Sequence, residues 1–132
     1  MYKIILWNVL AIALLLLFSR VVVAEDNITM PPLSIPDKID YFADKYSIES
    51  KVMHKIIKCE SNYNPKAVNW QDSHKLSKGS HGIGQFSKET IKGFGQQIDI
   101  ENADPYNVDQ ALEVMAYMLS EGKGRHWTCF RK

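Results

Sequence analysis

An apolar segment near the start of the chain limits what the rest of it can fold into. Lys3 precedes an apolar run over residues 9–18, and small residues then lead to an acidic pair at 25–26. A positive start, an apolar centre and a small-residue exit are typical of a secretory signal peptide, so we expect residues 1–24 to be one and the protein to be exported, to the periplasm or outside the cell. The alternative is an uncleaved membrane anchor, in which Arg20 would interrupt a span of about 20 residues.

The remaining chain has room for one domain. Residues 25–36 contain three prolines and no periodicity, which predicts a linker before a domain over residues 37–132. Two of the 16 basic residues leave with the signal peptide, so 14 basic residues face 15 acidic ones, a net charge of −1 that does not favour nucleic acid. We expect no metal and no cofactor, because the histidines lack metal-binding spacing: His54, His74, His81 and His126.

Both cysteines, Cys59 and Cys129, lie in the part of the chain expected to be exported. In an oxidising compartment an even pair most simply forms a disulfide. Such a bridge would close a loop of about 70 residues, which the chain-entropy relation values at roughly 4 kcal/mol of stability. The alternative is a pair of free buried thiols.

Apolar residues at helical spacing predict four helices. Between the second and the third, residues 62–84 are rich in Asn, Ser, Gly and His, and they predict a loop or at most a small hairpin. The fold class is therefore a small, mainly helical domain. The first predicted helix begins at Pro36, and the second covers residues 49–60. The third follows a Ser87 cap and stops at Gly93–Gly95, and the fourth begins at a cap on Asp104.

Glu60 is the residue that most suggests chemistry. It continues the apolar stripe of Ile56 and Ile57 at the end of the second predicted helix, so it should face the body of the protein or a cleft. The negative end of the helix and the apolar neighbours both favour the protonated carboxyl, so we expect the pKa of Glu60 to be raised. A raised pKa suits a general acid that protonates a glycosidic oxygen. The structural alternative is an ordinary solvated side chain.

Three motifs in series resemble the soluble lytic transglycosylase domain, a relative of goose-type lysozyme. They are "ESNYNPKAVN" at residues 60–69, "GIGQF" at 82–86 and "DPYN" at 104–107, and the resemblance covers roughly residues 37–129. It implies a lysozyme-like fold, in which the loop or minor hairpin forms the cleft. It also implies an enzyme that binds the glycan strands of peptidoglycan and cleaves the MurNAc–GlcNAc β-1,4 bond with formation of 1,6-anhydromuramic ends.

The resemblance assigns roles to residues of this chain. Glu60 matches the catalytic acid and base, and Ser61 matches the serine beside it, which would position the substrate or the carboxylate; the alternative for Ser61 is a plain helix-end hydroxyl. Gln85 matches a glutamine of the sugar cleft, and Gly82 would allow a close backbone approach or simply form a turn. Tyr117 falls where the family has a tyrosine near the cleft, and core packing is its alternative. Asn107 matches an asparagine at the last helix start, where it also suits a cap.

Departures from the family pattern leave questions open. The usual glycine-containing turn after the last helix is missing, and a Cys59–Cys129 bridge would replace its support in a compact variant. Asp72 is the candidate second carboxylate for a lysozyme-type hydrolysis. We favour a surface turn for Asp72 and Glu60 acting alone. A third alternative is a non-catalytic peptidoglycan-binding protein. The role is open among wall growth, attack on other cells and service to a cell-envelope secretion or conjugation machine.

Overall fold

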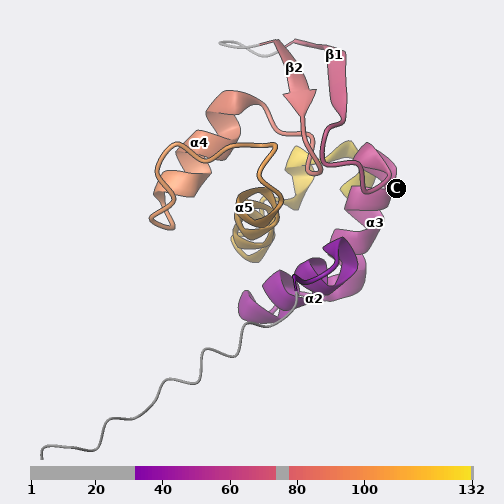
Figure 1. Cartoon of the computed structure of the whole chain (residues 1–132), viewed down its shortest axis with the longest axis vertical. Coiled ribbons are helices and arrows are strands. Elements are labelled where there is room, and N and C mark those ends of the chain that lie inside the picture. The colour runs from indigo at the N-terminus through magenta and orange to yellow at the C-terminus, as the bar shows by residue number, and fades with distance from the viewer. Residues whose placement is uncertain (1–31, 74–77, 132) are drawn as a thin grey trace, which may run out of the picture. The chain divides into compact units, whose positions relative to one another are not determined.

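A computed structural model describes residues 32–73 and 78–131. The expected signal peptide, residues 1–24, and most of the expected linker lie outside the described residues. No helix within the described ranges is long and apolar enough to cross a membrane. The elements in chain order are α2 (Ile35–Lys45), α3 (Ser50–Ser61), β1 (Val68–Ser73), β2 (Lys78–His81), α4 (Lys88–Gln96), α5 (Val108–Ser120) and two 3₁₀ turns, η1 (Gly124–His126) and η2 (Thr128–Phe130) (Figure 1).

The first two helices follow the predicted apolar faces. Helix α2 begins at Ile35, slightly before the predicted start, because Ser34 and Asp37 form a reciprocal capping box. Helix α3 covers almost the predicted range and ends at Ser61. Its C-cap, Asn62, takes a left-handed conformation and donates its backbone N–H to the Lys58 carbonyl oxygen. The buried residues on these faces are Ile39, Phe42 and Ala43 in α2, and Met53, Ile56 and Ile57 in α3.

The last two helices depart from the predicted boundaries. Ser87 caps α4 as expected, but the helix continues to Gln96, so the predicted stop at Gly93–Gly95 is wrong. Gly95 lies inside the helix and serves close packing, since a Cβ there would lie 2.7 Å from Ala103 Cβ. Helix α5 begins only at Val108, with Asn107 as its cap. Asp104 instead closes the preceding turn by accepting the Tyr106 backbone N–H at 3.0 Å, so the predicted start at Asp104 is wrong.

A two-stranded antiparallel hairpin interrupts the helices, which confirms the weakly predicted small hairpin. Val68 pairs with His81 and Asn69 with Ser80, and the register shifts between Asn69 and Ser73. The base of the hairpin is fixed by His81, which is buried and binds the Tyr106 hydroxyl at 2.8 Å.

Helix α5 forms the centre of the core. In Figure 1 it lies between α4 on one side and the α2–α3 pair on the other, and the hairpin projects from one end. Six α5 residues are buried. The second 3₁₀ turn, η2, folds back against α3. The arrangement is a small, mainly helical, lysozyme-like domain, as predicted, and it brings the end of α3, the hairpin and the C-terminal turns together.

Candidate active site

A pocket of about 320 Å³ opens where these three segments meet. Four parts of the chain contribute: the end of α3, both strands of the hairpin, the turn after β2, and the C-terminal turns. Its lining residues are Glu60, Asn69, Asp72, Ser80, Gln85, His126, Trp127 and Thr128. The pocket therefore holds two carboxylates, an imidazole and several hydrogen-bonding groups around one hollow.

Another hollow, of about 390 Å³, follows α4 and is lined by Gln96, Asp99, Glu101 and Asn102. It is larger, but its side chains are exposed polar residues from the end of α4 and from the loop that directly follows it. No group of three His, Cys, Asp or Glu side chains placed to hold a metal occurs there or elsewhere in the described residues. We therefore take the pocket at Glu60, which combines residues distant in sequence, as the candidate active site.

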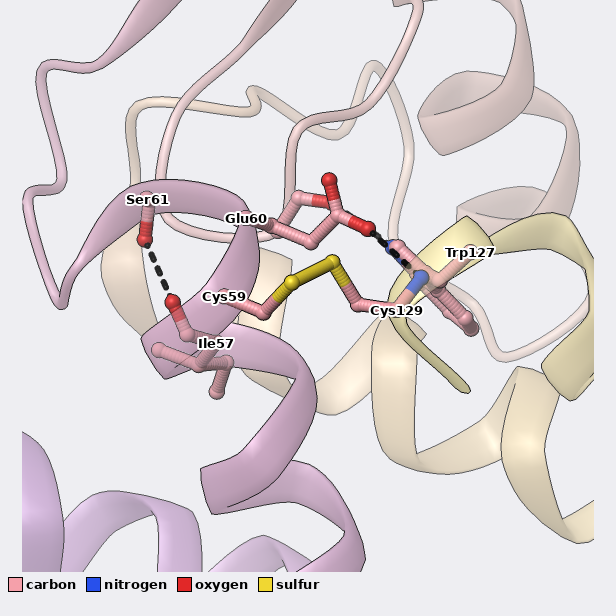
Figure 2. Close-up of a disulfide and its surroundings, with 7 residues drawn as sticks. Ile57, Cys59, Glu60, Ser61, Trp127 and Cys129 are labelled. Carbon is pink, nitrogen blue, oxygen red and sulfur yellow. Dashed lines mark hydrogen bonds between the residues drawn. A yellow bond between two sulfur atoms is a disulfide. The ribbon is translucent and has the colours of Figure 1, made fainter. Parts of the chain in front are cut away.

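Glu60 is positioned by the last turn of α3 and by the C-terminal turns together. Its Oε1 accepts the backbone N–H of Cys129 at 3.4 Å, and its side chain is half-buried. The preceding residue, Cys59, forms the predicted disulfide with Cys129, with a Cα–Cα distance of 6.0 Å. Figure 2 shows the Glu60 side chain and the disulfide lying next to each other between α3 and the C-terminal segment. Glu60 was expected to face the body of the protein or a cleft, and its side chain lines this pocket.

Asp72 lies in the same pocket, so the preference for a surface turn is wrong. It belongs to β1, is half-buried, and accepts a hydrogen bond from Ser80 Oγ at 2.5 Å. Residues three apart, such as Asn69 and Asp72, would face opposite sides of a regular strand. The register shift between Asn69 and Ser73 lets both of them line the pocket.

Gln85 lines the pocket, where the resemblance placed it. Its backbone φ is 49°, and its side-chain Nε2 donates to the Gly82 carbonyl oxygen at 2.9 Å and to that of Ala67 at 3.2 Å. Its backbone N–H also donates to the Gly82 carbonyl oxygen, so Gln85 is held by the turn after β2 and by Ala67, just before β1, which fixes this wall of the pocket.

The structure does not bring the other candidate substrate-binding residues to the pocket, whose lining among the described residues excludes Ser61, Gly82 and Tyr117. Ser61 Oγ donates to the Ile57 carbonyl oxygen at 3.2 Å, on the side of α3 away from the Glu60 side chain (Figure 2). Its position fits the plain helix-end hydroxyl.

Gly82 and Tyr117 have structural surroundings instead. Gly82 has a φ of 73°, and a Cβ there would lie 1.8 Å from the Pro105 carbonyl oxygen, so this glycine permits the close approach of two loops and not of a sugar. The Tyr117 hydroxyl donates to Gln97 Oε1 at 3.1 Å, and its ring centroid lies 6.1 Å from that of Tyr46. The packing alternative fits Tyr117.

Five lining residues were not predicted. Asn69 and Ser80 needed the hairpin register, which the sequence does not specify. Among the C-terminal lining residues, only Trp127 could have been noticed in the sequence, because an aromatic residue close to a cysteine suits a terminus that packs against the core. Its indole Nε1 donates to the Gly84 carbonyl oxygen at 2.8 Å, and its side chain is buried. The neighbours His126 and Thr128 reach the pocket because Trp127 anchors them.

Comparison with known proteins identifies the family of the chain. The chain matches the family model described as "Transglycosylase SLT domain" over residues 37–128, a range that contains α3, the hairpin and most of the C-terminal turns. No curated protein and no solved structure matches the chain significantly. Since the match spans well over half of the chain, the protein belongs to the transglycosylase SLT domain family, a family that implies lytic transglycosylase activity and binding of peptidoglycan.

Proposed function

We propose that this protein is a peptidoglycan lytic transglycosylase that cleaves the MurNAc–GlcNAc β-1,4 bond, with Glu60 as general acid and then general base. The observation that carries the proposal is the position of Glu60. It is the first residue of the motif at residues 60–69, lies within the matched range, and lines a pocket together with Gln85. A carboxyl group in a recess beside hydrogen-bonding side chains is the arrangement that glycoside cleavage uses.

The first step is bond cleavage with proton donation. The protonated Glu60 carboxyl transfers its proton to the glycosidic oxygen, and the bond between that oxygen and MurNAc C1 breaks. The electron pair leaves with the GlcNAc hydroxyl. The acetamido oxygen of the MurNAc residue stabilises the positive charge that develops at C1. Glu60 is now a carboxylate.

The second step closes a ring. The Glu60 carboxylate takes the proton from the MurNAc C6 hydroxyl, and O6 attacks C1 to form the 1,6-anhydro product. This proton restores the Glu60 acid, so no water is consumed and no cofactor is needed. One side chain therefore serves both steps, as acid and as base.

Hydrolysis is the second candidate reaction, and the position of Asp72 supports it. Asp72 lines the same pocket and is held by Ser80, so a second carboxylate is available to activate a water or to stabilise the cation. Water would then attack C1, and the product would carry a reducing-end muramic acid. The two reactions share Glu60 and differ in the product.

The mass of the released muropeptides tests these alternatives. We expect wild-type protein to release anhydro-muropeptides from purified sacculi, lighter than hydrolysed ones by one water, and Glu60→Gln to release none. Glu121→Gln is the matched control, since Glu121 also stands at the end of a helix but is exposed and outside the pocket. Reducing-end products that vanish in Asp72→Asn would favour hydrolysis. Binding of sacculi without products would leave a non-catalytic glycan-binding protein.

The proposal extends to location. A disulfide between Cys59 and Cys129 suits an oxidising compartment, and peptidoglycan lies outside the cytoplasmic membrane. We therefore propose an exported protein, periplasmic or extracellular, tethered to the membrane if the N-terminal segment stays uncleaved. Fractionation of cells that produce the full chain tests this, and a protein recovered in the cytoplasm with free thiols would contradict it.

A further inference from the structure

Two links join the end of α3 to the C-terminal segment Trp127–Cys129, which we call the tail wall. The disulfide from Cys59 is covalent, and the backbone N–H of Cys129 donates to Glu60 Oε1 at 3.4 Å. Two adjacent residues of α3 thus contact Cys129: Cys59 bonds to its side chain, and Glu60 accepts from its backbone N–H (Figure 2). The bridge therefore fixes the distance between the Glu60 carboxyl and this donor.

The Cys129 N–H is available to Glu60 because Cys129 lies in the first turn of η2, where backbone N–H groups have no acceptor within the turn. Within this turn the hydrogen bonds are donated by the next two residues, Phe130 to the Trp127 carbonyl oxygen at 3.1 Å and Arg131 to that of Thr128 at 3.3 Å. The Cys129 N–H comes before both of them and points toward the pocket. A 3₁₀ turn this short is not stable by itself, so its position depends on its tertiary contacts, here the disulfide to α3.

The tail wall has a second anchor on the opposite side. Trp127 is 2% exposed, its indole Nε1 donates to the Gly84 carbonyl oxygen at 2.8 Å, and its ring packs edge-on against Phe86 at 5.7 Å. Gly84 directly precedes Gln85, which lines the pocket. The tail wall thus connects the segment that carries Glu60 with the segment that carries Gln85.

We propose that the tail wall is a positioning element for catalysis: the Cys129 backbone N–H orients the Glu60 carboxyl, and the Cys59–Cys129 disulfide holds that donor in place. This rests on the proposed function, in that Glu60 is taken as the acid and base. The donor acts through Glu60 and needs no contact with the sugar. The competing explanation is a bridge that only stabilises the fold.

The first test follows the Cys129 amide of the oxidised wild-type protein by NMR during a pH titration. An amide that donates to a carboxyl group changes its chemical shift when that group ionises. Asp72 and His126 also line the pocket and carry ionisable side chains, so Glu60→Gln and Asp72→Asn are compared. We expect the acid-range step of the Cys129 amide to vanish in Glu60→Gln and to persist in Asp72→Asn. The control resonance is the Lys123 amide, which donates to the Met118 carbonyl oxygen at 2.8 Å.

This test does not depend on enzymatic activity. The positioning role is overturned if the chemical shift of the Cys129 amide does not change with pH, or if it changes identically in wild type and in Glu60→Gln. This holds even if the protein makes anhydro-muropeptides. Conversely, active Glu60→Gln protein contradicts the proposed function whatever the amide does. The two proposals therefore fail separately.

The second test removes the bridge with the double substitution Cys59→Ser and Cys129→Ser. Activity is measured on soluble glycan chains, at a temperature where circular dichroism shows the variant folded. We expect kcat to fall about tenfold, the loss typical of one hydrogen bond to a charged group, while KM changes less than about twofold. The alkaline limb of the pH–rate profile should move to higher pH, because the anion loses a donor. Unchanged kcat and pH profile, with only a lower melting temperature, would show a purely stabilising bridge. If the variant does not fold, the amide titration decides.

Discussion

The pocket has two walls that are built differently. The hairpin wall, formed by Asn69, Asp72 and Ser80, belongs to a two-stranded sheet with an irregular register, and its tryptophan, Trp70, is 66% exposed. The tail wall has almost no regular structure, yet its tryptophan, Trp127, is 2% exposed. A disulfide and an indole hydrogen bond fix the tail wall to the core on both sides. Regular secondary structure is therefore a poor guide to which wall is firmly held.

The difference suggests a division of roles. The tail wall contacts Glu60 directly, so its integrity should decide whether the acid is correctly placed. The hairpin wall carries Asp72, so it should influence whether water or the substrate's own hydroxyl attacks C1. Substitutions in the tail wall should therefore change stability and rate, and substitutions in the hairpin wall should change mainly the products.

The largest effect is expected from Trp127→Ala. Removing a fully packed aromatic side chain typically costs about 3–5 kcal/mol, and here the Gly84 carbonyl oxygen also loses its donor. The same substitution in the hairpin wall, Trp70→Ala, removes an exposed ring and should cost about 0.5 kcal/mol or less. Urea unfolding of the two variants measures both values. Equal losses would contradict the contrast between the walls.

Reduction of the disulfide should have the next largest effect. Opening a loop between residues 70 apart in sequence typically removes about 2–4 kcal/mol, mostly because the unfolded chain gains freedom. We expect the melting temperature to fall when dithiothreitol is added to wild-type protein and to stay unchanged when it is added to the variant with both cysteines replaced by serine. A wild-type melting temperature that does not respond to dithiothreitol would show that the bridge contributes no stability.

Much of the fold could be predicted because its helices are locally specified. Helix α3 follows from an apolar stripe that carries its own stop at Asn62, and the α4 start follows from the Ser87 cap. The boundaries that failed depend on tertiary contacts. Gly95 resembles a helix stop, but it is the residue that lets the loop at Ala103 pack closely, and Asp104 has equally good uses as a helix cap and as a turn residue.

The candidate site could be predicted only where a residue's role is local. Glu60 was found because it continues the stripe of its own helix, and Gln85 because a motif marks it. Asp72 was misplaced because its direction depends on a register shift that no pattern in β1 announces. Ser61 and Tyr117 were assigned through the resemblance, and the structure gives both of them hydrogen bonds to residues outside the pocket lining. His126 and Thr128 enter the site only through the anchoring of Trp127.

Ser80→Ala should have a smaller effect, confined to the hairpin wall. Ser80 Oγ donates to Asp72 at 2.5 Å, so the substitution should cost about 1 kcal/mol of stability and free the Asp72 carboxylate to turn. If Asp72 activates water, the share of reducing-end products should fall while total cleavage stays within about twofold, a rate change worth less than about 1 kcal/mol. Mass analysis of the digests measures this share. Asp72→Asn is the companion variant, and a product ratio that neither variant alters would exclude Asp72 from the choice of product.

The smallest effect is expected away from both walls, at Asp40. This α2 residue accepts hydrogen bonds from Ser50 Oγ and from His54 Nε2, both in α3. The bond from Ser50 has the larger effect, and together the two bonds lower the pKa of Asp40 below its usual 3.8. A lowered pKa in the folded protein means that Asp40 adds stability above its usual pKa, and that this stability is lost as the pH falls through the lower value. Asp40→Asn should therefore be slightly less stable than wild type near neutral pH and equal to it in strong acid.

Thermal unfolding at about pH 6 and at about pH 2.5 measures this convergence, which follows from the linkage of ionisation to folding. Asp40 is exposed and lies outside the pocket, so the rate of anhydro-muropeptide release should match wild type wherever both proteins are folded. A large loss of activity in Asp40→Asn would mean that the other end of α3 also sets the position of Glu60. The tail wall would then share the positioning role with the contact between α2 and α3.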